Sequence, residues 1–294
     1  MNDKANRVRE LDFWRDSVTP RPVEGGMTNA NFIVRDRGRD YFVRVGEDMP
    51  VHGIVRSHET AANKAASAAG ISPRVVHARA GILVLEFISG RTLTEKDVRR
   101  DDCLDRILPL IRSCHRDVPR YFRGAALMFW VFQVIRDYAA TLREGKSRMV
   151  PELPLLTAQA DALERAVGQV DIVFGHNDLL AANFIDDGER LWLVDFDYAG
   201  FNSPLFDLGG LASNNSLDPS QEIRLLECYF EEAVSEERWI SYQAMKCASL
   251  LRESMWSMVS ELHSEIDFDY RAYTEENLSR YESAMKRFLD LKSP

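Results

Sequence analysis

The sequence predicts an α+β protein with two lobes, a small β-rich lobe at residues 1–88 and a larger α-helical lobe at residues 89–294. Short β-rich runs bounded by Gly, Pro and Asp dominate the first part, and long segments with helical periodicity dominate the second. A polar stretch at 172–200, which contains two strand-like runs, interrupts the helices. We expect a ligand cleft where the two lobes meet.

The composition limits the class of protein and the kind of partner. The chain has 294 residues, of which 45% are hydrophobic, and this is enough for two lobes. A net charge of −9 argues against a nucleic-acid-binding surface and suits a cationic substrate. No apolar run is long enough for a membrane span, and the charged start "MNDKANRVRELDFW" does not resemble a signal peptide.

The cysteines indicate a reducing compartment. They lack the spacing of a zinc site and are expected to be free thiols: Cys103, Cys114, Cys228 and Cys247. We therefore expect a cytoplasmic protein without a membrane partner. A homodimer is left open, because nothing in the sequence decides the oligomeric state.

Each element of the small lobe follows from a short pattern. The predicted strands are "RPVEGG" at 21–26, "NFIVRD" at 31–36 and "YFVRVG" at 41–46. The Ala-rich run at 58–70 predicts a helix that is stopped by Gly70 and Pro73. The β-rich run that follows predicts a hairpin turning at Ala80–Gly81, and Gly90 then predicts a hinge.

The large lobe is predicted to be mostly helical. The expected helices are at about 101–116, 127–144, 155–169, 219–235, 238–264 and 270–291. The strand-rich stretch at 172–200 lies between the third and fourth of them. This order predicts a helical lobe that carries a polar insert with two strands.

Carboxylate and amide side chains follow both strand-like runs of this insert. Asp178 and Asn183 lie five residues apart in a loop after the first run. The second run, "RLWLVDFDYAG", alternates like a strand and places Asp195 and Asp197 on one face. Asn183 and Asp195 are then expected to converge as oxygen ligands, which suit Mg²⁺. Asp178 is left to accept a proton from a substrate hydroxyl.

The same residues have an ordinary structural explanation. Asp and Asn in loops often serve only to make turns, and any one of them alone is best explained in that way. The combined order H-x-D-x₄-N, strand, D-F-acid is far more specific, and it favours a functional site.

This order resembles the catalytic and metal-binding loops of the protein kinase superfamily. In detail, "GHNDLLAANFI" and "LVDFDYAGFNSPLFDLG" resemble the choline/ethanolamine kinases and the related aminoglycoside phosphotransferases. The resemblance implies a bilobal protein-kinase-like fold with Asp178 as the catalytic residue. It implies Asn183 and Asp195 as magnesium ligands, and Asp197, which replaces a Glu, is grouped with them.

Two further residues receive roles from this resemblance. His176 is implied to support the catalytic loop, and this is also its ordinary structural explanation. Asp207, in "FDLGG", is implied to anchor the loop by hydrogen bonds, and we group it with the acceptor side of the site.

The nucleotide, expected to be ATP, requires a phosphate-binding loop in the small lobe. Gly25 and Gly26 allow close approach of the backbone to a phosphate, and Thr28 and Asn29 add donors. Two glycines alone mostly mark a turn, but the run resembles the G-G-x-T-N loop of choline kinases. The predicted hinge includes Glu86, Phe87 and Ile88. Its backbone is expected to bind adenine, so the identity of its side chains says little about the nucleotide.

A buried cation is predicted beside the phosphates. Arg44 lies in an otherwise apolar strand and needs a partner there, and Glu59 on the following helix is the candidate. Such a pair matches the strand–helix ion pair of kinases, which the choline kinases build with Arg. The alternative is that Arg44 lies on the surface of an edge strand. Arg56, three residues before Glu59, matches the R-x-x-E pattern of the family or is a surface charge.

The acceptor pocket is predicted on the helix that contains "LRESMWSMVSEL". Trp256 lies off the apolar stripe of that helix, either as a second packing surface or as a wall of a cage for a quaternary ammonium. The stretch resembles the W-x-x-W-S region of choline kinases, with Glu253 in place of the first Trp. Asn214 replaces an acid that many members of the family carry. Aromatic residues that can complete a cage are Tyr198, Phe201, Phe129, Trp130 and Tyr270.

These observations predict an ATP- and Mg²⁺-dependent kinase that acts on a small cationic alcohol, with choline ranked first and ethanolamine second. One alternative keeps the chemistry and changes the acceptor to an aminoglycoside or another hydroxyl compound. A second alternative is a nucleotide-binding protein without turnover. The presence of both Asp178 and Asp195 argues against the second alternative.

Overall fold

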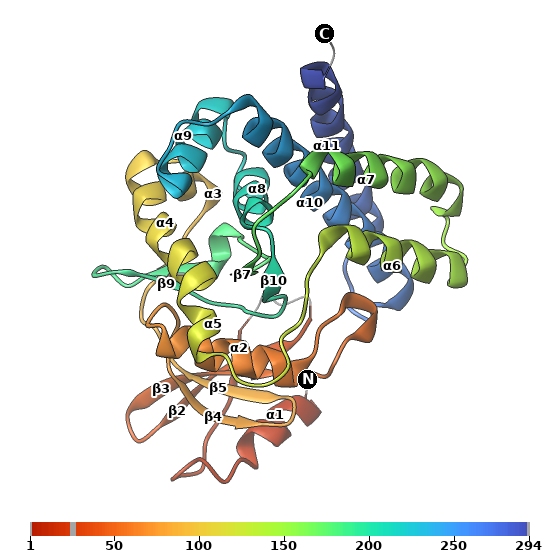
Figure 1. Cartoon of the computed structure of the whole chain (residues 1–294). Coiled ribbons are helices and arrows are strands. Elements are labelled where there is room, and N and C mark those ends of the chain that lie inside the picture. Colours follow the sequence, from red (N-terminus) through yellow and green to blue (C-terminus); the bar gives the residue numbers. More distant parts are fainter. Residues whose placement is uncertain (1, 24–27, 293–294) are drawn as a thin grey trace.

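The structure is a computed structural model that describes residues 2–23 and 28–292. Gly25 and Gly26, predicted to bind phosphate, lie outside the described residues. A lobe built on a sheet and a larger helical lobe are stacked on each other, and the chain order matches the predicted α+β, protein-kinase-like plan (Figure 1). In the described part of the chain, no helix combines the length and the apolar character that a membrane crossing requires.

The small lobe contains an antiparallel sheet with the strand order β1-β2-β3-β5-β4. Its strands are β1 (Arg21–Val23), β2 (Ala30–Asp36), β3 (Arg39–Val45), β4 (Val75–Arg79) and β5 (Ile82–Glu86). The predicted hairpin is present, with its turn at Gly81, which adopts a φ of 72° that glycine tolerates well. Helix α1 (Asn2–Arg9), which we did not predict, buries Val8 in a small core with the sheet.

Helix α2 (Arg56–Ala68) corresponds to the predicted Ala-rich helix of the small lobe. Its buried alanines belong to the main hydrophobic core together with residues of the helical lobe. Glu59 and Arg56 in its first turns are buried as well. The helix therefore carries charged side chains into the region between the lobes.

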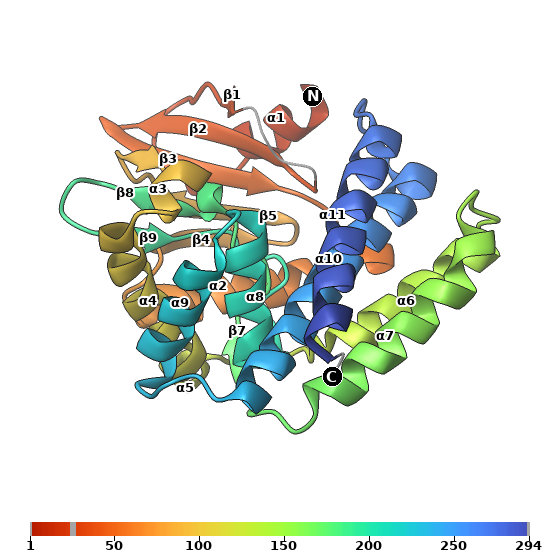
Figure 2. The same ribbon diagram turned by 90° about the horizontal axis from the view of Figure 1, so that it is seen from above.

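The large lobe is helical, as predicted. Its elements are α3 (Glu95–Val98), α4 (Asp101–Arg116), α5 (Val118–Tyr121), α6 (Val131–Glu144), α7 (Leu153–Val167), α8 (Pro204–Asn214), α9 (Pro219–Phe230), α10 (Glu236–His263) and α11 (Tyr270–Lys292), with the 3₁₀ turn η2 (Val150–Glu152) before α7. Another 3₁₀ turn, η1 (Pro50–His52), lies between β3 and α2 in the chain. Helix α10 runs through the lobe and contacts α6, α7, α8 and α11 (Figure 2). The predicted helix at 127–144 begins only at Val131, since Phe129 donates its backbone N–H to Phe201.

Helix α8 was not predicted, because its two glycines and its motif residues hid the helical pattern. The glycines have a packing role, since a Cβ on Gly209 would lie 3.0 Å from Cα of Lys246 on α10. This close approach of α8 and α10 brings the motif residue Asp207 beneath the catalytic loop.

Strands of the polar insert form two small sheets, and one of these sheets also includes a strand from the segment after the hinge. Strands β6 (Arg91–Thr92), β8 (Phe184–Asp186) and β9 (Leu191–Leu193) form one, and β7 (Val173–Gly175) and β10 (Gly200–Asn202) form the other. The prediction of one alternating strand through Asp197 is wrong, because β9 ends at Leu193 and Asp195 has a φ of 69°. A turn, rather than strand alternation, therefore sets the directions of the two carboxylates.

The chain passes from the small lobe to the large lobe between β5 and β6. Gly90 lies tightly against β8, since a Cβ there would be 2.5 Å from the carbonyl oxygen of Asp186. Gly90 thus permits a close backbone approach at the crossing point. The division into lobes at residue 88 stays a prediction that this arrangement supports.

Candidate active site

The loop after β7 is anchored from below by Asp207. One carboxylate oxygen accepts the backbone N–H of His176 at 2.7 Å, and the other accepts that of Asn177 at 2.7 Å. His115 Nε2 also lies 2.9 Å from the Asp207 carboxylate. Burial acts to raise the pKa of Asp207, but the hydrogen bonds from His115 and the loop lower it below its usual value. Both oxygens are engaged, which leaves neither free for an acceptor molecule and supports the anchoring role alone.

The anchoring role of Asp207 predicts the result of removing one of its acceptor oxygens. In Asp207→Asn, the amide nitrogen cannot accept a backbone N–H, so we expect a loss of about 1–3 kcal/mol in the free energy of unfolding. We expect a lower kcat with little change in the KM for ATP. Urea unfolding and steady-state kinetics measure the two effects.

Asp218 provides a matched control for this substitution. It also accepts two backbone N–H groups, those of Ser220 and Gln221, but at the exposed start of α9. Asn caps helices about as well as Asp, so Asp218→Asn should leave stability and kcat nearly unchanged. Equal effects of the two substitutions would contradict the anchoring role.

Asp178 lies in the anchored loop and faces a closed recess. Its side chain lines this recess together with Arg252 and Glu253 of α10. Burial raises the pKa of Asp178 to about 8, and the positive charge of Arg252 opposes this rise only in part. Other carboxylates also raise it: Glu253, Asp195 and Asp197. A carboxylate with a pKa near the working pH is suited to accept a proton from a hydroxyl.

His176 occupies the interior of the loop. Its Nε2 lies 2.9 Å from the carbonyl oxygen of Val194, and its ring packs edge-on against Phe196. The side chain is buried, and burial lowers its pKa. These contacts place His176 as a structural link between the catalytic loop and the segment that carries Asp195.

Asn183 and Asp195 are held next to each other by the backbone. Val194 donates its N–H to the carbonyl oxygen of Asn183 at 2.9 Å, and the Asn183 amide donates to the carbonyl oxygen of Asp178 at 2.8 Å. Because the amide nitrogen is the donor here, the Asn183 side-chain oxygen is left as an acceptor. Asn183 and Asp195 line the same cavity.

This oxygen pair fits a magnesium ion that is completed by phosphate oxygens and water. Mg²⁺ is usually held by one or two protein oxygens plus substrate phosphates, and does not need a full protein cage. Among the residues that the structure describes, no group of three or more His, Cys, Asp or Glu side chains is arranged as a metal site.

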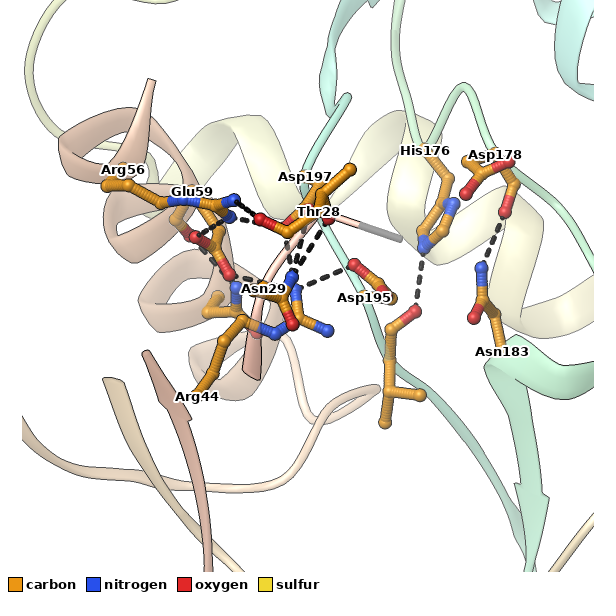
Figure 3. Close-up of polar contacts among 12 residues, drawn as sticks. Thr28, Asn29, Arg44, Arg56, Glu59, His176, Asp178, Asn183, Asp195 and Asp197 are labelled. Atoms are coloured by element: carbon orange, nitrogen blue, oxygen red, sulfur yellow. Dashed lines mark hydrogen bonds and ion pairs between the residues drawn. The ribbon is translucent and has the colours of Figure 1, made fainter. Parts of the chain in front are cut away.

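Arg44 and Arg56 form an ion network with three carboxylates (Figure 3). Nη1 of Arg44 lies 2.9 Å from Glu59, 2.7 Å from Asp195 and 2.6 Å from Asp197. Arg56 contacts Glu59 at 2.8 Å and Asp197 at 3.1 Å. Arg44 is only 7% exposed and lies on the central strand β3, so the edge-strand alternative is wrong. Burial opposes the charge of Arg44, but the carboxylates raise its pKa above the usual value.

Asp197 is placed differently from the prediction that groups it with the metal ligands. One oxygen is paired with Arg44 and Arg56, and the other accepts the hydroxyl of Thr28 at 2.9 Å and the amide of Asn29 at 3.4 Å. The two arginines hold the pKa of this carboxyl at about 2, against the effect of burial. Both oxygens are therefore occupied within the protein, and Asp197 fastens the Thr28–Asn29 segment to the helical lobe.

The predicted hinge borders a cavity of about 380 Å³. Glu86, Phe87 and Ile88 line one side of it, and Arg44 and Asp195 line another. Apolar side chains make up much of the remaining wall: Val23, Phe42, Leu83, Leu85, Ile185 and Val194. An apolar cavity with charged groups at one end suits a nucleotide, with the base between the apolar walls.

Trp256 lies on α10, three residues after Glu253. It is 5% exposed, stacks on His52 at 4.9 Å and donates its indole N–H to the hydroxyl of Tyr198 at 2.8 Å. The second-packing-surface explanation therefore accounts for most of its contacts. Its contribution to the site is the hydrogen bond that orients Tyr198.

Arg252 is a site residue that the sequence analysis missed. Its guanidinium lies 4.4 Å from the centre of the Tyr198 ring, and Nη1 donates to Glu253 at 2.9 Å. The second oxygen of Glu253 accepts the hydroxyl of Tyr273 at 2.8 Å. The available signal was the departure at Glu253, because a carboxylate that replaces an aromatic side chain in a half-buried place favours a cation nearby.

The structure separates the other candidate cage residues into two groups. Phe129 lies 6.1 Å from Tyr198, and Tyr270 lies 6.1 Å from Trp256, between ring centres. Asn214 lines the recess with Asp178. Two residues point to other partners: Trp130, which donates to Glu164, and Phe201, which packs on Phe174.

A family model described as choline/ethanolamine kinase matches residues 21–243, which is more than half of the chain. The chain belongs to the choline/ethanolamine kinase family. Its enzyme class is therefore that of a small-molecule kinase, which uses ATP.

Curated relatives match over most of their length. The protein LicA of Haemophilus influenzae is 26% identical over 292 residues, which cover 95% of this chain and 83% of LicA. A probable ethanolamine kinase of Arabidopsis thaliana is 28% identical, with 90% of this chain and 78% of that protein covered.

Solved structures support the same fold. A choline/ethanolamine kinase family protein from Mesorhizobium loti has a TM-score of 0.76 and 24% identity, over 99% of this chain and 98% of the other. The choline kinase LicA of Streptococcus pneumoniae has a TM-score of 0.73 and 24% identity, over 92% of this chain and 94% of the other. Together they show that the kinase-like fold extends over nearly the whole chain.

Proposed function

We propose that this kinase transfers the γ-phosphoryl group of ATP to the hydroxyl of a small amino alcohol, of the class of choline and ethanolamine. The observation that carries the proposal is the position of Asp178. Asp178 lies in the loop that leads to Asn183, and it lines the recess together with Glu253 and Arg252. A base at this position can take the proton of an acceptor hydroxyl while the oxygen of that hydroxyl faces the phosphoryl donor.

The nucleotide is expected to occupy the cavity between the lobes, with adenine against the hinge at Glu86–Ile88. Its phosphates would then point toward Arg44 and Asp195 at the charged end. Thr28 and Asn29 add donors near the same place. These groups are suited to hold the phosphates in line with the acceptor oxygen.

In the reaction, the acceptor oxygen forms a bond to the γ-phosphorus while the bond to the β-phosphate oxygen breaks, and ADP leaves. Asp178 takes the hydroxyl proton. Asn183 and Asp195 would hold Mg²⁺, which when bound neutralises charge on the phosphates. His176 and Asp207 keep the loop in place and do not take part in proton transfer.

The acceptor side supports an amino alcohol through Glu253, whose carboxylate faces the recess. Arg252 holds the place beside Glu253 and the Tyr198 ring, and a substrate cation that displaced it would gain charge pairing and cation–π attraction. The net charge of −9 attracts such a cation as well. An aminoglycoside acceptor has no comparable support, because the likeness to a spectinomycin phosphotransferase, at 14% identity, concerns the fold alone. A cytoplasmic location and a homodimer stay predictions.

The test of this proposal is an acceptor panel with ATP and Mg²⁺, in which ADP release and the phosphorylated alcohol are both measured. We expect turnover with at least one small amino alcohol and none after chelation of Mg²⁺. Asp195→Asn should raise the Mg²⁺ concentration that gives half-maximal rate, because one ligand loses its charge. Asp187→Asn, in the turn between β8 and β9, is the control and should behave as wild type. Nucleotide binding without transfer to any alcohol would favour the non-catalytic alternative.

A further inference from the structure

Arg252 is a buried cation on the acceptor side for which the proposed reaction has no use. The residue is 4% exposed, and its guanidinium lies 4.4 Å from the ring centre of Tyr198 and 5.5 Å from that of Phe129. Aromatic faces attract cations. The chain therefore already places one of its own cations on the face that a substrate ammonium would need, and a second cation there would meet like charge.

One edge of this guanidinium is paired and the other edge is not. Nη1 donates to Glu253 at 2.9 Å. Within residues 2–23 and 28–292, Nε and Nη2 of Arg252 are buried and make no hydrogen bond of ordinary geometry, although the hydroxyl of Tyr138 also interacts with the guanidinium. Charged donors that are buried without a partner destabilise a protein, so their presence in a site indicates a ligand group that pairs with them.

The free edge has the geometry for a planar oxyanion. Nε and Nη2 form the outer edge of a guanidinium and bind the two oxygens of a carboxylate in parallel. The same chain uses this edge elsewhere, where Arg148 holds Glu261 with distances of 2.8 Å from Nε and 2.9 Å from Nη2. Arg252 thus has the same pair of donors, Nε and Nη2, on a side chain that lines the acceptor recess.

The size of the recess strengthens this argument. The space lined by Asp178, Arg252 and Glu253 is only about 10 Å³, or room for about one water molecule. An acceptor that occupied this recess would have to move side chains that line it, and Arg252 is one of them. A carboxylate on the acceptor can do so while it pairs with Nε and Nη2, whereas a plain ammonium repels the guanidinium.

We propose that the acceptor carries a carboxylate as well as an amine and a hydroxyl, and that Arg252 binds this carboxylate through Nε and Nη2. The preferred substrates are then small hydroxy amino acids, and the inference rests on the proposed kinase function. Glu253 lies beside Arg252 and already accepts Arg252 Nη1 and the Tyr273 hydroxyl, and its remaining lone pairs can accept the amine of such a zwitterion. The transferred phosphoryl group is a second source of oxyanion, but Arg252 is not among the residues that line the nucleotide cavity, whereas Arg44 and Asp195 are.

The test uses pairs of acceptors that differ only by a carboxylate. The pairs are serine with ethanolamine, threonine with 1-amino-2-propanol, and homoserine with 3-amino-1-propanol. For the wild type, we expect kcat/KM to be higher for the carboxylated member of at least one pair, by about tenfold or more. Arg252→Met should remove this preference, mainly through a higher KM for the carboxylated member.

The controls separate specificity from folding. Arg148→Met removes a similar arginine–glutamate pair outside the site and should leave the preference unchanged. Arg252→Lys keeps the charge but loses the fork, and should lower the preference without abolishing turnover. If Arg252→Met fails to fold, as judged by circular dichroism, the ratio measured with wild type decides the question.

Three different results would contradict the inference, and only the last of them would also contradict the proposed function. Activity that is equal or higher with the plain amino alcohol of every pair overturns this inference and leaves the proposed function intact. An increase in the KM for ATP in Arg252→Met, equal across all acceptors, assigns the free edge to the phosphoryl group and also overturns it. Absence of phosphorylation for every compound overturns both.

Discussion

Asp178→Asn is expected to lower kcat by about 10²- to 10⁴-fold, while the KM for ATP and the thermal stability stay close to those of the wild type. Replacement by an amide removes the proton acceptor but keeps the shape of the side chain. The loop itself is held by Asp207 through backbone groups, so its position should not depend on the Asp178 carboxylate. Steady-state kinetics with a saturating acceptor and nucleotide-binding titrations measure these effects.

The pH profile of the wild type gives an independent check of the same role. The pKa of Asp178 is raised to about 8, so most molecules of the free enzyme carry its proton at pH 7. A required base is active only when deprotonated, and kcat/KM for the acceptor should therefore rise with pH and level off above about 8. This rising limb should be missing from the residual activity of Asp178→Asn. A wild-type profile that is flat between pH 6 and 9 would contradict the assignment.

Arg44→Met is expected to cause the largest loss of stability, about 3–5 kcal/mol in the free energy of unfolding. The substitution keeps most of the side-chain volume but leaves Glu59 and Asp197 buried with only Arg56 as a cation nearby. Removing one partner of a buried ion pair is strongly destabilising, because the remaining charge cannot be solvated. Urea unfolding at pH 7 measures the loss.

The control for Arg44 is an arginine of the same lobe whose ion pair is exposed. Arg74 contacts Glu86 at 2.6 Å, and both side chains are open to solvent. Exposed pairs contribute little, so Arg74→Met should have a much smaller effect on unfolding. If the two substitutions destabilise the protein equally, the buried network around Arg44 contributes no more to stability than an exposed ion pair.

The parts of the site that the sequence predicts well are those set by short motifs. Asp178 and Asn183 lie close together because they are only five residues apart, and the Asn183 amide donates to the Asp178 carbonyl oxygen at 2.8 Å. Their catalytic and metal-binding roles stay predictions. The Arg44–Glu59 pair follows from a charge in an apolar strand, since such a charge has few partners within reach. In both cases, local chain geometry or the penalty for an unpaired charge leaves few arrangements.

The parts that sequence reasoning missed depend on tertiary structure. The period of a strand would place Asp195 and Asp197 together, but β9 ends early and Asp195 adopts a positive φ. Both carboxylates still meet Arg44, because the network and not the strand decides where they point. Arg252 was overlooked for a similar reason. Its neighbours Phe129, Asp178 and Tyr198 come from three separate segments, and no pattern along α10 reveals them.

Helix α10 carries residues of the proposed acceptor site, and it also packs at the centre of the large lobe. Arg252, Glu253 and Trp256 lie within one turn of it, and its other faces contact α6, α7, α8 and α11. Variants selected for a new acceptor would have to change residues whose neighbours form the main core. Divergence of substrate preference in this protein should therefore proceed through pairs of substitutions, one that reshapes the recess and one elsewhere that restores the lost folding energy.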